Sequence, residues 1–291
     1  MASAKNNTGG LNEVSSYDEP WDAGSRRTIT GFSNPLVKFL RSLRDKKHRK
    51  REKRFLAEGL RLLTDARECG IVPEMLVMAI GRDPHPLLDA LEDAVTAAGG
   101  EVVEMDVEIL AKVTGKDNPQ AVAGVFAEFD TGLANLDRAS APIWLVAQAL
   151  RDPGNLGTML RTGDAVGAGG LILIDDCADP FSVEAVRASM GAIFTQKLVI
   201  ARWDEFIAWL HAGEGQLVAA SLRDPTDYRE AAYADPCFLM VGNESQGLPA
   251  EYEEACDLRV TIPMLGRADS LNAAVAGAVL AYEALAHLRR A

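Results

Sequence analysis

Short apolar runs alternate with segments of helical character along most of this 291-residue chain. In the second half the apolar runs include GLILID (170–175), QKLVI (196–200) and CFLMVGN (237–243). Strands this apolar, with helices between them, are typical of a mostly parallel sheet that helices cover on both faces. The alternation therefore predicts an α/β fold.

The chain divides into two units of this kind. The segment DTGLANLDRASAP (130–142) has no periodicity and collects turn-forming residues, so we place a linker there. Residues 31–130 then form a compact α/β domain of ordinary size, and residues 141–291 form a second one. Asn34–Pro35 is a good start for a helix, with Asn as the N-cap. Residues 1–30 mix Asp, Glu, Asn, Ser and Gly and are expected to be a flexible tail.

Three loops in the second domain follow directly on strand-like runs. They lie in the sequences QALRDPGNLGTMLRTGDAVGAGG (148–170), LMVGNESQGLP (239–249) and VTIPMLGRADSLNAA (260–274). Each loop is built from Gly, Pro, Asn, Asp or Ser, and the first and third continue into a helix. Loops at strand ends are where an open α/β sheet usually forms its ligand crevice. We therefore expect a ligand site where these loops meet.

The first and second loops contain polar side chains that are open to two interpretations. Asn155 closes a turn, and Arg161 stands six residues further along the helix. These two residues could serve a reaction, or they could be an N-capping Asn and a surface Arg. In the second loop, Gly242 and Gly247 would let the backbone approach a ligand closely. Glu244 could anchor Arg161 through a bidentate ion pair, or it could be an exposed loop carboxylate.

The third loop opens the C-terminal helix. Ser270 is a plausible N-cap of that helix, and capping alone would explain its presence. Capping does not explain Asn272, because Asn is a poor helix former and the surrounding run is apolar and rich in Ala. Asn272 is therefore a candidate site residue.

Charge is distributed unevenly along the chain. The formal net charge is −12, which taken alone argues against a nucleic-acid partner. Residues 38–54, however, contain ten Lys or Arg residues and only Asp45 and Glu52 as acids. A polyanion responds to such a local field, and phosphate contacts are made by one Lys or Arg at a time. The segment could be a solvated helix face, but its single sign favours contact with nucleic acid.

Other features exclude several classes of protein. No apolar run approaches the roughly 18 residues of a membrane span, and the N-terminus has no apolar signal segment, so we expect a cytoplasmic protein without a membrane partner. The four Cys and four His are scattered without zinc-ligand spacing, so we expect no metal.

The glycines of VGAGGLILIDD (166–176) follow a helix and open a strand. That order is wrong for a dinucleotide-binding loop and argues against a nicotinamide-dependent oxidoreductase.

In this order and with these residues, the three loops resemble the signature motifs of the SpoU-type RNA ribose 2′-O-methyltransferases of the SPOUT superfamily. The resemblance is close over residues 141–288. It implies S-adenosylmethionine as methyl donor, an RNA substrate, a homodimer and a trefoil knot in the C-terminal domain, which general folding rules disfavour. It implies that the donor is contacted by Gly242, Ile262, Met264 and Leu271. It places at the reaction centre Asn155, Arg161, Glu244, Ser270 and Asn272.

FLAEGLRLL (55–63) and VTGKDNPQAVAGVF (113–126) resemble, more loosely, the ribosomal-protein-L30e-like substrate domain that many family members carry before the methyltransferase domain. This resemblance implies that residues 31–130 bind RNA. The expected phosphate contacts, which set affinity more than sequence choice, are Lys46, Lys47, Arg49, Lys50, Arg51 and Arg54. The appended domain favours ribosomal RNA as substrate. The alternatives are transfer RNA, or a non-catalytic RNA-binding or ribosome-assembly protein of the same fold.

Ribose 2′-O-methylation is the attack of a hydroxyl oxygen on a sulfonium methyl group. The protein must orient the two groups and help the hydroxyl lose its proton. The family account gives the position of Arg161 the role of base or of polarising group. A guanidinium has a pKa above about 12 and is not normally deprotonated in proteins. We therefore favour a role for Arg161 in gripping the target phosphate and stabilising alkoxide character, with Asn155, Ser270 and Asn272 positioning the ribose.

Overall fold

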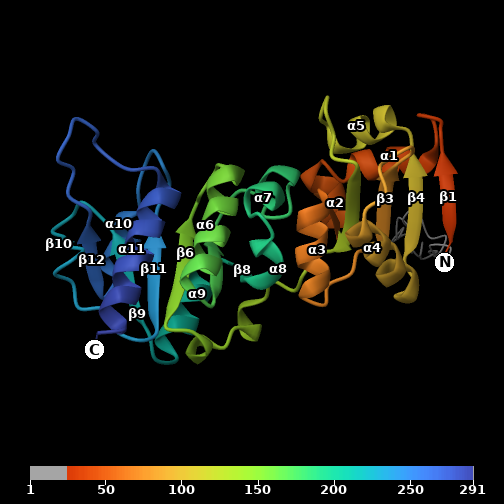
Figure 1. The fold of residues 1–291 in the computed structure, drawn as a ribbon. Coiled ribbons are helices and arrows are strands. Elements are labelled where there is room, and N and C mark those ends of the chain that lie inside the picture. The colour runs from red at the N-terminus through yellow and green to blue at the C-terminus, as the bar shows by residue number, and fades with distance from the viewer. Residues whose placement is uncertain (1–24, 291) are drawn as a thin grey trace, which may run out of the picture.

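The computed structural model describes residues 25–290 as two α/β domains side by side (Figure 1). The first domain is built on a five-stranded sheet and the second on a seven-stranded sheet. A connecting segment with two one-turn 3-10 helices, Leu133–Asn135 and Arg138–Ser140, joins them. Among the helices between residues 25 and 290, none combines the length and the hydropathy that crossing a bilayer requires.

The first domain alternates strands and helices around a mixed sheet. Its elements in chain order are β1 Arg26–Ile29, α1 Pro35–Ser42, α2 Lys46–Glu52, β2 Arg54–Glu58, α3 Leu60–Glu68, β3 Met75–Ala79, α4 Pro86–Ala97, β4 Glu101–Met105, α5 Val107–Thr114 and β5 Val122–Ala127. The strand order is β1-β4-β3-β5-β2, and β5 is antiparallel to both of its neighbours. Helices α1 and α5 pack on one face of the sheet, and α3 and α4 pack on the other.

Strand β1 corrects the expectation that all of residues 1–30 form a flexible tail. Its four residues pair in parallel with β4, and Ile29 is buried in the core. The sequence RRTI hides this strand because it lies at a sheet edge, where only one of its side chains needs to be apolar. The rest of the tail prediction, residues 1–24, lies outside the described residues.

The basic segment spans the end of α1 and the whole of α2. As predicted, Asn34 caps α1, since its Oδ1 accepts a hydrogen bond from the backbone nitrogen of Leu36 at 2.9 Å. The Asp45 carboxylate caps α2 in the same way, accepting from the backbone nitrogen of Lys47 at 2.8 Å. This second cap starts a new helix. As a result, five of the ten basic residues lie in α2 and only two in α1.

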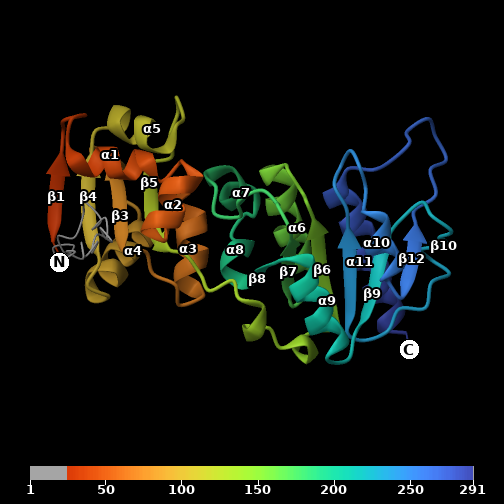
Figure 2. The same ribbon diagram turned by 180° about the vertical axis from the view of Figure 1, so that it is seen from behind.

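The second domain contains the parallel sheet that the apolar runs predicted. Its elements are β6 Ile143–Gln148, α6 Pro153–Val166, β7 Gly170–Ile174, α7 Val183–Ala188, α8 Ala192–Thr195, β8 Lys197–Ala201, α9 Trp203–His211, β9 Gln216–Ala220, β10 Thr226–Asp227, β11 Cys237–Val241, α10 Ala250–Glu254, β12 Leu258–Thr261 and α11 Ala273–Leu288. Neighbouring strands pair in parallel in the order β10-β12-β9-β11-β6-β7-β8. Helices α6, α7, α8 and α11 cover one face of this sheet, and α9 and α10 cover the other (Figure 2). The trefoil knot remains a prediction from the family resemblance.

The direction in which strands are added reverses between β6 and β11. From β6 the chain builds outward through β7 and β8, and it then returns to place β9 and β11 on the other side of β6. At such a switch point the loops after the two adjacent strands diverge and leave a crevice. Two of the three polar loops follow β6 and β11, so the fold places them at this point.

Aromatic side chains join the two domains. The ring of Phe55 in β2 lies 5.1 Å from that of Phe181, and Phe126 in β5 lies 4.9 Å from Phe194 in α8. Phe129, just before the connecting segment, contacts the rings of both Phe181 and Phe194. These residues belong to one hydrophobic cluster with members from both domains. The domains are therefore packed against each other through a shared apolar core.

Candidate active site

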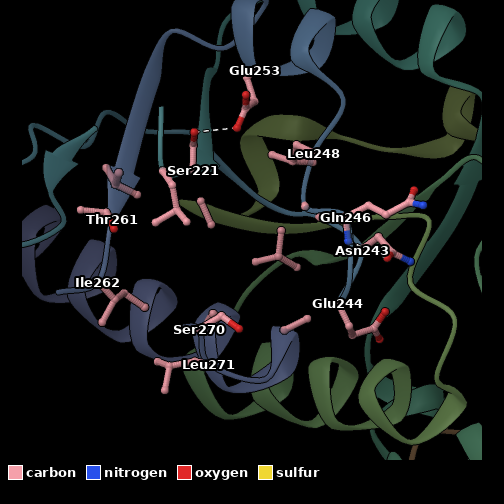
Figure 3. A pocket seen from close by; sticks show the side chains of 18 of the residues that line it. Ser221, Asn243, Glu244, Gln246, Leu248, Glu253, Thr261, Ile262, Ser270 and Leu271 are labelled. Atoms are coloured by element: carbon pink, nitrogen blue, oxygen red, sulfur yellow. Dashed lines mark hydrogen bonds between the residues drawn. The ribbon is translucent and has the colours of Figure 1, made fainter. Parts of the chain in front are cut away.

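The three polar loops meet at the carboxyl ends of β6, β11 and β12. The side-chain amide of Asn243, after β11, donates to the backbone carbonyl of Ala149, after β6, at 2.9 Å. A cavity of about 530 Å³ opens beside this junction (Figure 3). Its walls come from the loop after β11, from the end of β12 with the loop that follows, from the beginning of α11, and from the residues that follow β9. The second and third loops singled out in the sequence therefore line one cavity, and the first loop is joined to them beside it.

The four residues expected to contact the methyl donor all line this cavity. Gly242 belongs to the wall formed after β11, Ile262 and Met264 follow β12, and Leu271 precedes α11. A Cβ atom at Gly242 would lie 2.6 Å from the backbone nitrogen of Leu248, which is closer than real Cβ contacts come. Only glycine therefore lets the two arms of this loop pack against each other.

The loop after β11 is a tight turn closed on itself by Asn243. The backbones of Asn243 and Gly247 exchange two hydrogen bonds, and Gly247 closes the turn with a left-handed φ of +68°. The Asn243 Oδ1 accepts from the backbone nitrogens of Ser245 and Gln246. Sequence reasoning did not single out Asn243. Its signal was its place between the two glycines of GNESQG, where a side chain able to bond its own loop is favoured.

A chain of side-chain hydrogen bonds joins the three loops beside the cavity. The Asn272 Nδ2 donates to the Asn155 Oδ1 at 2.8 Å, and the Asn155 Nδ2 donates to the Glu244 Oε1 at 3.0 Å. Since an ionised carboxylate can only accept, Glu244 fixes which end of the Asn155 amide faces it. The Asn155 oxygen must then face Asn272. Three of the five predicted reaction-centre residues, one from each loop, are therefore brought into direct contact.

Of the two interpretations left open for Glu244, the ion pair with Arg161 is not the one that the structure shows. Glu244 is engaged by Asn155, and Arg161 makes no salt bridge with any residue between positions 25 and 290. The Arg161 side chain is exposed on α6, between one and two helical turns beyond Asn155. An exposed guanidinium without a carboxylate partner can bind an anionic group of another molecule, such as a phosphate.

Asn272, and not Ser270 as predicted, caps the C-terminal helix. The Asn272 Oδ1 accepts from the backbone nitrogens of Ala274 and Val275, at 3.0 and 3.3 Å. The helix begins two residues later than a Ser270 cap would require, because Asn272 uses both ends of its amide, the oxygen for the cap and the nitrogen for Asn155. Ser270 instead lines the cavity (Figure 3).

Comparison with known proteins assigns this arrangement to a family. The profile of the SpoU rRNA Methylase family matches residues 142–282, and that of the MRM3-like substrate binding domain matches residues 34–124. The 23S rRNA (guanosine(2553)-2′-O)-methyltransferase RlmP of Bacillus subtilis is 33% identical over 264 residues, which cover 90% of this chain and 99% of RlmP. The chain belongs to the SpoU rRNA methylase family.

Solved structures of family members contain both domains. The rRNA methyltransferase from Sinorhizobium meliloti, solved with AdoMet bound, is 38% identical with a TM-score of 0.85, over 90% of this chain and 98% of that one. AviRb from Streptomyces viridochromogenes, solved in complex with the cofactor AdoMet, is 26% identical with a TM-score of 0.79, over 88% and 98% of the two chains. As a SpoU family member, this chain is an RNA methyltransferase that uses S-adenosylmethionine.

In this SpoU family member, the basic residues of α2 divide into buried and exposed ones. Arg49 is buried, and its Nη2 lies 2.7 Å from the carboxylate of Asp179 in the second domain. The prediction that Arg49 contacts RNA is therefore wrong, because this ion pair holds the guanidinium inside the domain interface. Lys46, Lys47 and Lys50 are exposed and form no salt bridge with the part of the chain that the structure describes.

Arg51 and Arg54 are intermediate cases. The Arg51 side chain is 53% exposed and pairs with Glu52, while the Arg54 side chain is 29% exposed and pairs with Glu74. Each guanidinium already holds a carboxylate of its own domain. For these two residues, contact with RNA stays a prediction.

A second polar pair lines the cavity on the side away from Ser270 (Figure 3). The Ser221 Oγ donates to the Glu253 Oε1 at 2.6 Å, and both residues are buried. Arg223 approaches the other carboxylate oxygen of Glu253, at 3.4 Å. Sequence reasoning missed this pair because Ser221 follows β9 whereas Glu253 lies in α10, and no motif links two residues 32 positions apart.

Three of the four thiols are held in apolar surroundings. Desolvation raises the pKa of Cys177 to about 11 and the pKa of both Cys237 and Cys256 to about 12. At neutral pH these thiols are therefore protonated and poorly nucleophilic. Within residues 25–290, no group of three or more His, Cys, Asp or Glu side chains is arranged to hold a metal ion.

Proposed function

We propose that this chain transfers the methyl group of S-adenosylmethionine to the 2′-oxygen of a ribose in ribosomal RNA. The observation that carries the proposal is the hydrogen-bonded chain Asn272–Asn155–Glu244. It ties the edge of the cavity to the first turn of α6, the helix from which Arg161 projects. Relatives that span nearly the whole chain are named as methyltransferases of ribosomal RNA, which favours this substrate over transfer RNA and favours the cytoplasm as the place of action.

The cavity fits the methyl donor in size and lining. Its volume of about 530 Å³ lies within the usual range of small-molecule sites, about 300–1,000 Å³. Gly242 lets the loop that forms one wall fold tightly on itself, and Ile262, Met264 and Leu271 supply apolar surface. When bound, S-adenosylmethionine supplies a methyl group that its sulfonium already activates, so the protein residues have to orient the donor and prepare the acceptor.

The acceptor is prepared by residues at the edge of the cavity. Arg161 binds the phosphate beside the target ribose and stabilises negative charge that develops on the 2′-oxygen. We do not assign it the role of a base, because guanidinium groups are not normally deprotonated in proteins. Asn155, held by Glu244 on one side and Asn272 on the other, presents a fixed amide to the ribose. Ser270 adds a hydroxyl at the cavity wall.

Replacing Asn272 by Asp is expected to separate the capping role of this residue from its role in the site. Asp keeps an oxygen for the backbone of α11, and its charge suits a helix N-terminus, so the melting temperature should stay near that of the wild type. It cannot donate to Asn155, so methyl transfer should fall about tenfold or more. Asn272→Ala should lose both roles, with a further loss of about 1 kcal/mol in the free energy of unfolding. Equal activity of Asn272→Asp and wild type would remove the amide chain from the proposal.

The enzyme is also proposed to be a homodimer. Leu271 precedes α11, and Val275 and Tyr282 lie on the same side of this helix at spacings of four and seven residues. Their exposed fractions are 37%, 47% and 56%, and Leu265 in the preceding loop is 98% exposed. Apolar side chains gathered at one surface mark an interface, and a second copy would cover them together with the edge of the cavity.

The dimer predicts the effect of a charge on this helix face. Val275→Glu should convert the protein to monomers in size-exclusion chromatography with light scattering, because a carboxylate would have to lose water inside the interface. Thr96→Glu, on the exposed side of α4 in the first domain, serves as control, and this variant should still elute with the mass of a dimer. A wild-type protein that elutes as a monomer at all concentrations would contradict the homodimer.

The substrate class is tested by methyl incorporation. The purified protein is incubated with radiolabelled S-adenosylmethionine and, separately, with ribosomal RNA and transfer RNA from cells that lack the gene. We expect label in ribosomal RNA and background levels in transfer RNA. Label confined to transfer RNA would overturn the substrate class, and no label in either would support a non-catalytic RNA-binding protein.

A further inference from the structure

The buried ion pair of Arg49 fixes α2 against the methyltransferase domain. The Arg49 Nε and Nη2 both donate to one oxygen of Asp179, at 3.2 and 2.7 Å, and its Nη1 donates to the backbone carbonyl of Leu43 at 2.8 Å. The other oxygen of Asp179 accepts from the backbone nitrogen of Phe181 at 2.9 Å, in the loop between β7 and α7. The side chains are only 3% and 11% exposed. This pair therefore orients α2 and leaves no guanidinium for an outside ligand.

Two other cations of α2 face the same loop from the outside. Lys46 and Lys50 lie one helical turn apart and are exposed. The guanidinium of Arg151 and, more weakly, the ammonium groups of Lys46 and Lys50 lower the pKa of the Asp176 carboxyl. The geometry agrees, because Arg151 forms an ion pair with Asp176, and Arg49, which stands between Lys46 and Lys50 on α2, is bonded to Asp179, three residues after Asp176. Figure 1 shows that α2 of the first domain lies beside α7 of the second, and that α6 lies on the far side of α7.

Arg151 connects this group of cations with the reaction centre. It directly precedes Asp152, the N-cap of α6, whose carboxylate accepts from the backbone nitrogen of Asn155 at 2.7 Å. Its side chain is 60% exposed, and its partner Asp176 is 72% exposed. Exposed ion pairs of this kind contribute little, so a phosphate can replace the carboxylate at small cost. Arg151 is thus available for RNA, in contrast to Arg49.

We propose that Lys46, Lys50 and Arg151 form one track for the phosphates of the RNA strand, leading from the substrate domain to Asn155 and Arg161. The buried Arg49–Asp179 pair has a positioning role: it holds α2 against the second domain, so that Lys46 and Lys50 stay aligned with Arg151. The proposal rests on the proposed function, because it takes RNA as the substrate. It assigns to Arg151 and Asp179 roles that the sequence motifs did not reveal, and it replaces the phosphate contact first expected of Arg49.

The track is tested by the salt dependence of RNA binding. Fluorescence anisotropy of labelled polyuridylate, a probe without a target sequence, is measured over a range of KCl concentrations with the full-length protein. Arg151→Ala should weaken binding about tenfold and reduce the slope of log K against log[salt] by about 0.7, the value for one lost contact to a single strand. The double variant Lys46→Ala, Lys50→Ala should reduce the slope by about twice as much. Asp176→Asn should strengthen binding, because it removes the carboxylate that competes for Arg151.

Arg229→Ala is the matched control. The Arg229 side chain is 62% exposed and ion-paired to Asp227, but it follows β10 at the opposite edge of the sheet from β8. Arg229→Ala should leave both the affinity for polyuridylate and the slope of log K against log[salt] at wild-type values. The binding of S-adenosylmethionine, measured by calorimetry, should be unchanged in the whole series. Wild-type affinity and slope in Arg151→Ala and in the double lysine variant would overturn the track.

The positioning role is tested by kinetics on ribosomal RNA. Asp179→Asn should raise the KM for RNA several-fold with a smaller effect on kcat. In this background, Arg151→Ala should raise the KM by a smaller factor than it does in the wild type, because α2 is already displaced relative to Arg151. Should Asp179→Asn fail to fold, the pair Arg49→Met with Asp179→Leu removes both buried charges and keeps the apolar packing. An unchanged KM in a folded variant would overturn the positioning role. Wild-type protein that transfers no methyl to any RNA would instead be a failure of the proposed function.

Discussion

Arg161→Lys is expected to lower kcat for methyl transfer to ribosomal RNA about 100-fold, the usual cost of removing one donor that stabilises a developing oxyanion. Lysine keeps the positive charge but has no planar fork, so it cannot hold a phosphate and the 2′-oxygen with fixed geometry. Arg161 makes no salt bridge within residues 25–290, and its replacement should leave the fold intact. Single-turnover rates with saturating RNA and S-adenosylmethionine measure the effect.

The result is specific only if other properties of this variant remain normal. Its melting temperature and its affinity for S-adenosylmethionine should equal those of the wild type, because Arg161 does not line the cavity. Arg290→Lys, another exposed arginine, near the C-terminal end of the chain, should have the wild-type rate. Near-full turnover of Arg161→Lys would mean that a point charge suffices, and the bidentate role would have to be abandoned.

Gly242→Ala is expected to have its largest effect on the methyl donor. The new Cβ would lie 2.6 Å from the carbonyl oxygen of Gly247 and from the backbone nitrogen of Leu248, so the loop after β11 has to open. That loop forms a wall of the cavity and holds Glu244 against Asn155. Overpacking of this kind costs about 1–3 kcal/mol. We expect calorimetry to show binding of S-adenosylmethionine weakened about tenfold or more, and the melting temperature should fall as well.

Gly266→Ala is the control for this substitution. Gly266 lies in the loop between β12 and α11, its φ is not positive, and no atom within 4 Å would meet a new Cβ. The same change of one methyl group should therefore leave binding and stability unchanged. Wild-type affinity in Gly242→Ala would contradict the assignment of this cavity to the methyl donor.

The sequence predicted where the site lies but not which side chains in it are bonded. Strand-like runs followed by Gly, Asn and Ser loops predicted a ligand site at this edge of the sheet, and the family resemblance assigned Gly242, Ile262 and Leu271 to it; all three line the cavity. The partner of Glu244 was left open, because Asn155 and Arg161 lie on the same helix and only the three-dimensional arrangement decides which of them meets the carboxylate. The cap of α11 was misplaced for a similar reason, since Ser270 and Asn272 are both good caps.

Contacts between distant segments account for the remaining errors. Arg49 belongs to a run of ten basic residues, and its burial depends on Asp179, which is 130 positions away in the sequence. Strand β1 has a single buried apolar residue, Ile29, because it lies at the edge of its sheet. Patterns of hydrophobicity and spacing report on local structure, and such long-range pairings leave no local signal.

The central claim is that the cavity and Arg161 together methylate the ribose and not the base. The most direct test uses S-adenosylmethionine with a deuterated methyl group and ribosomal RNA from cells that lack the gene. The RNA is then digested to nucleosides, which are analysed by mass spectrometry. We predict label in one 2′-O-methylnucleoside, with the mass shift on the ribose fragment, and none with Arg161→Ala. Label on a base fragment, or no label with the wild-type protein, would contradict the account.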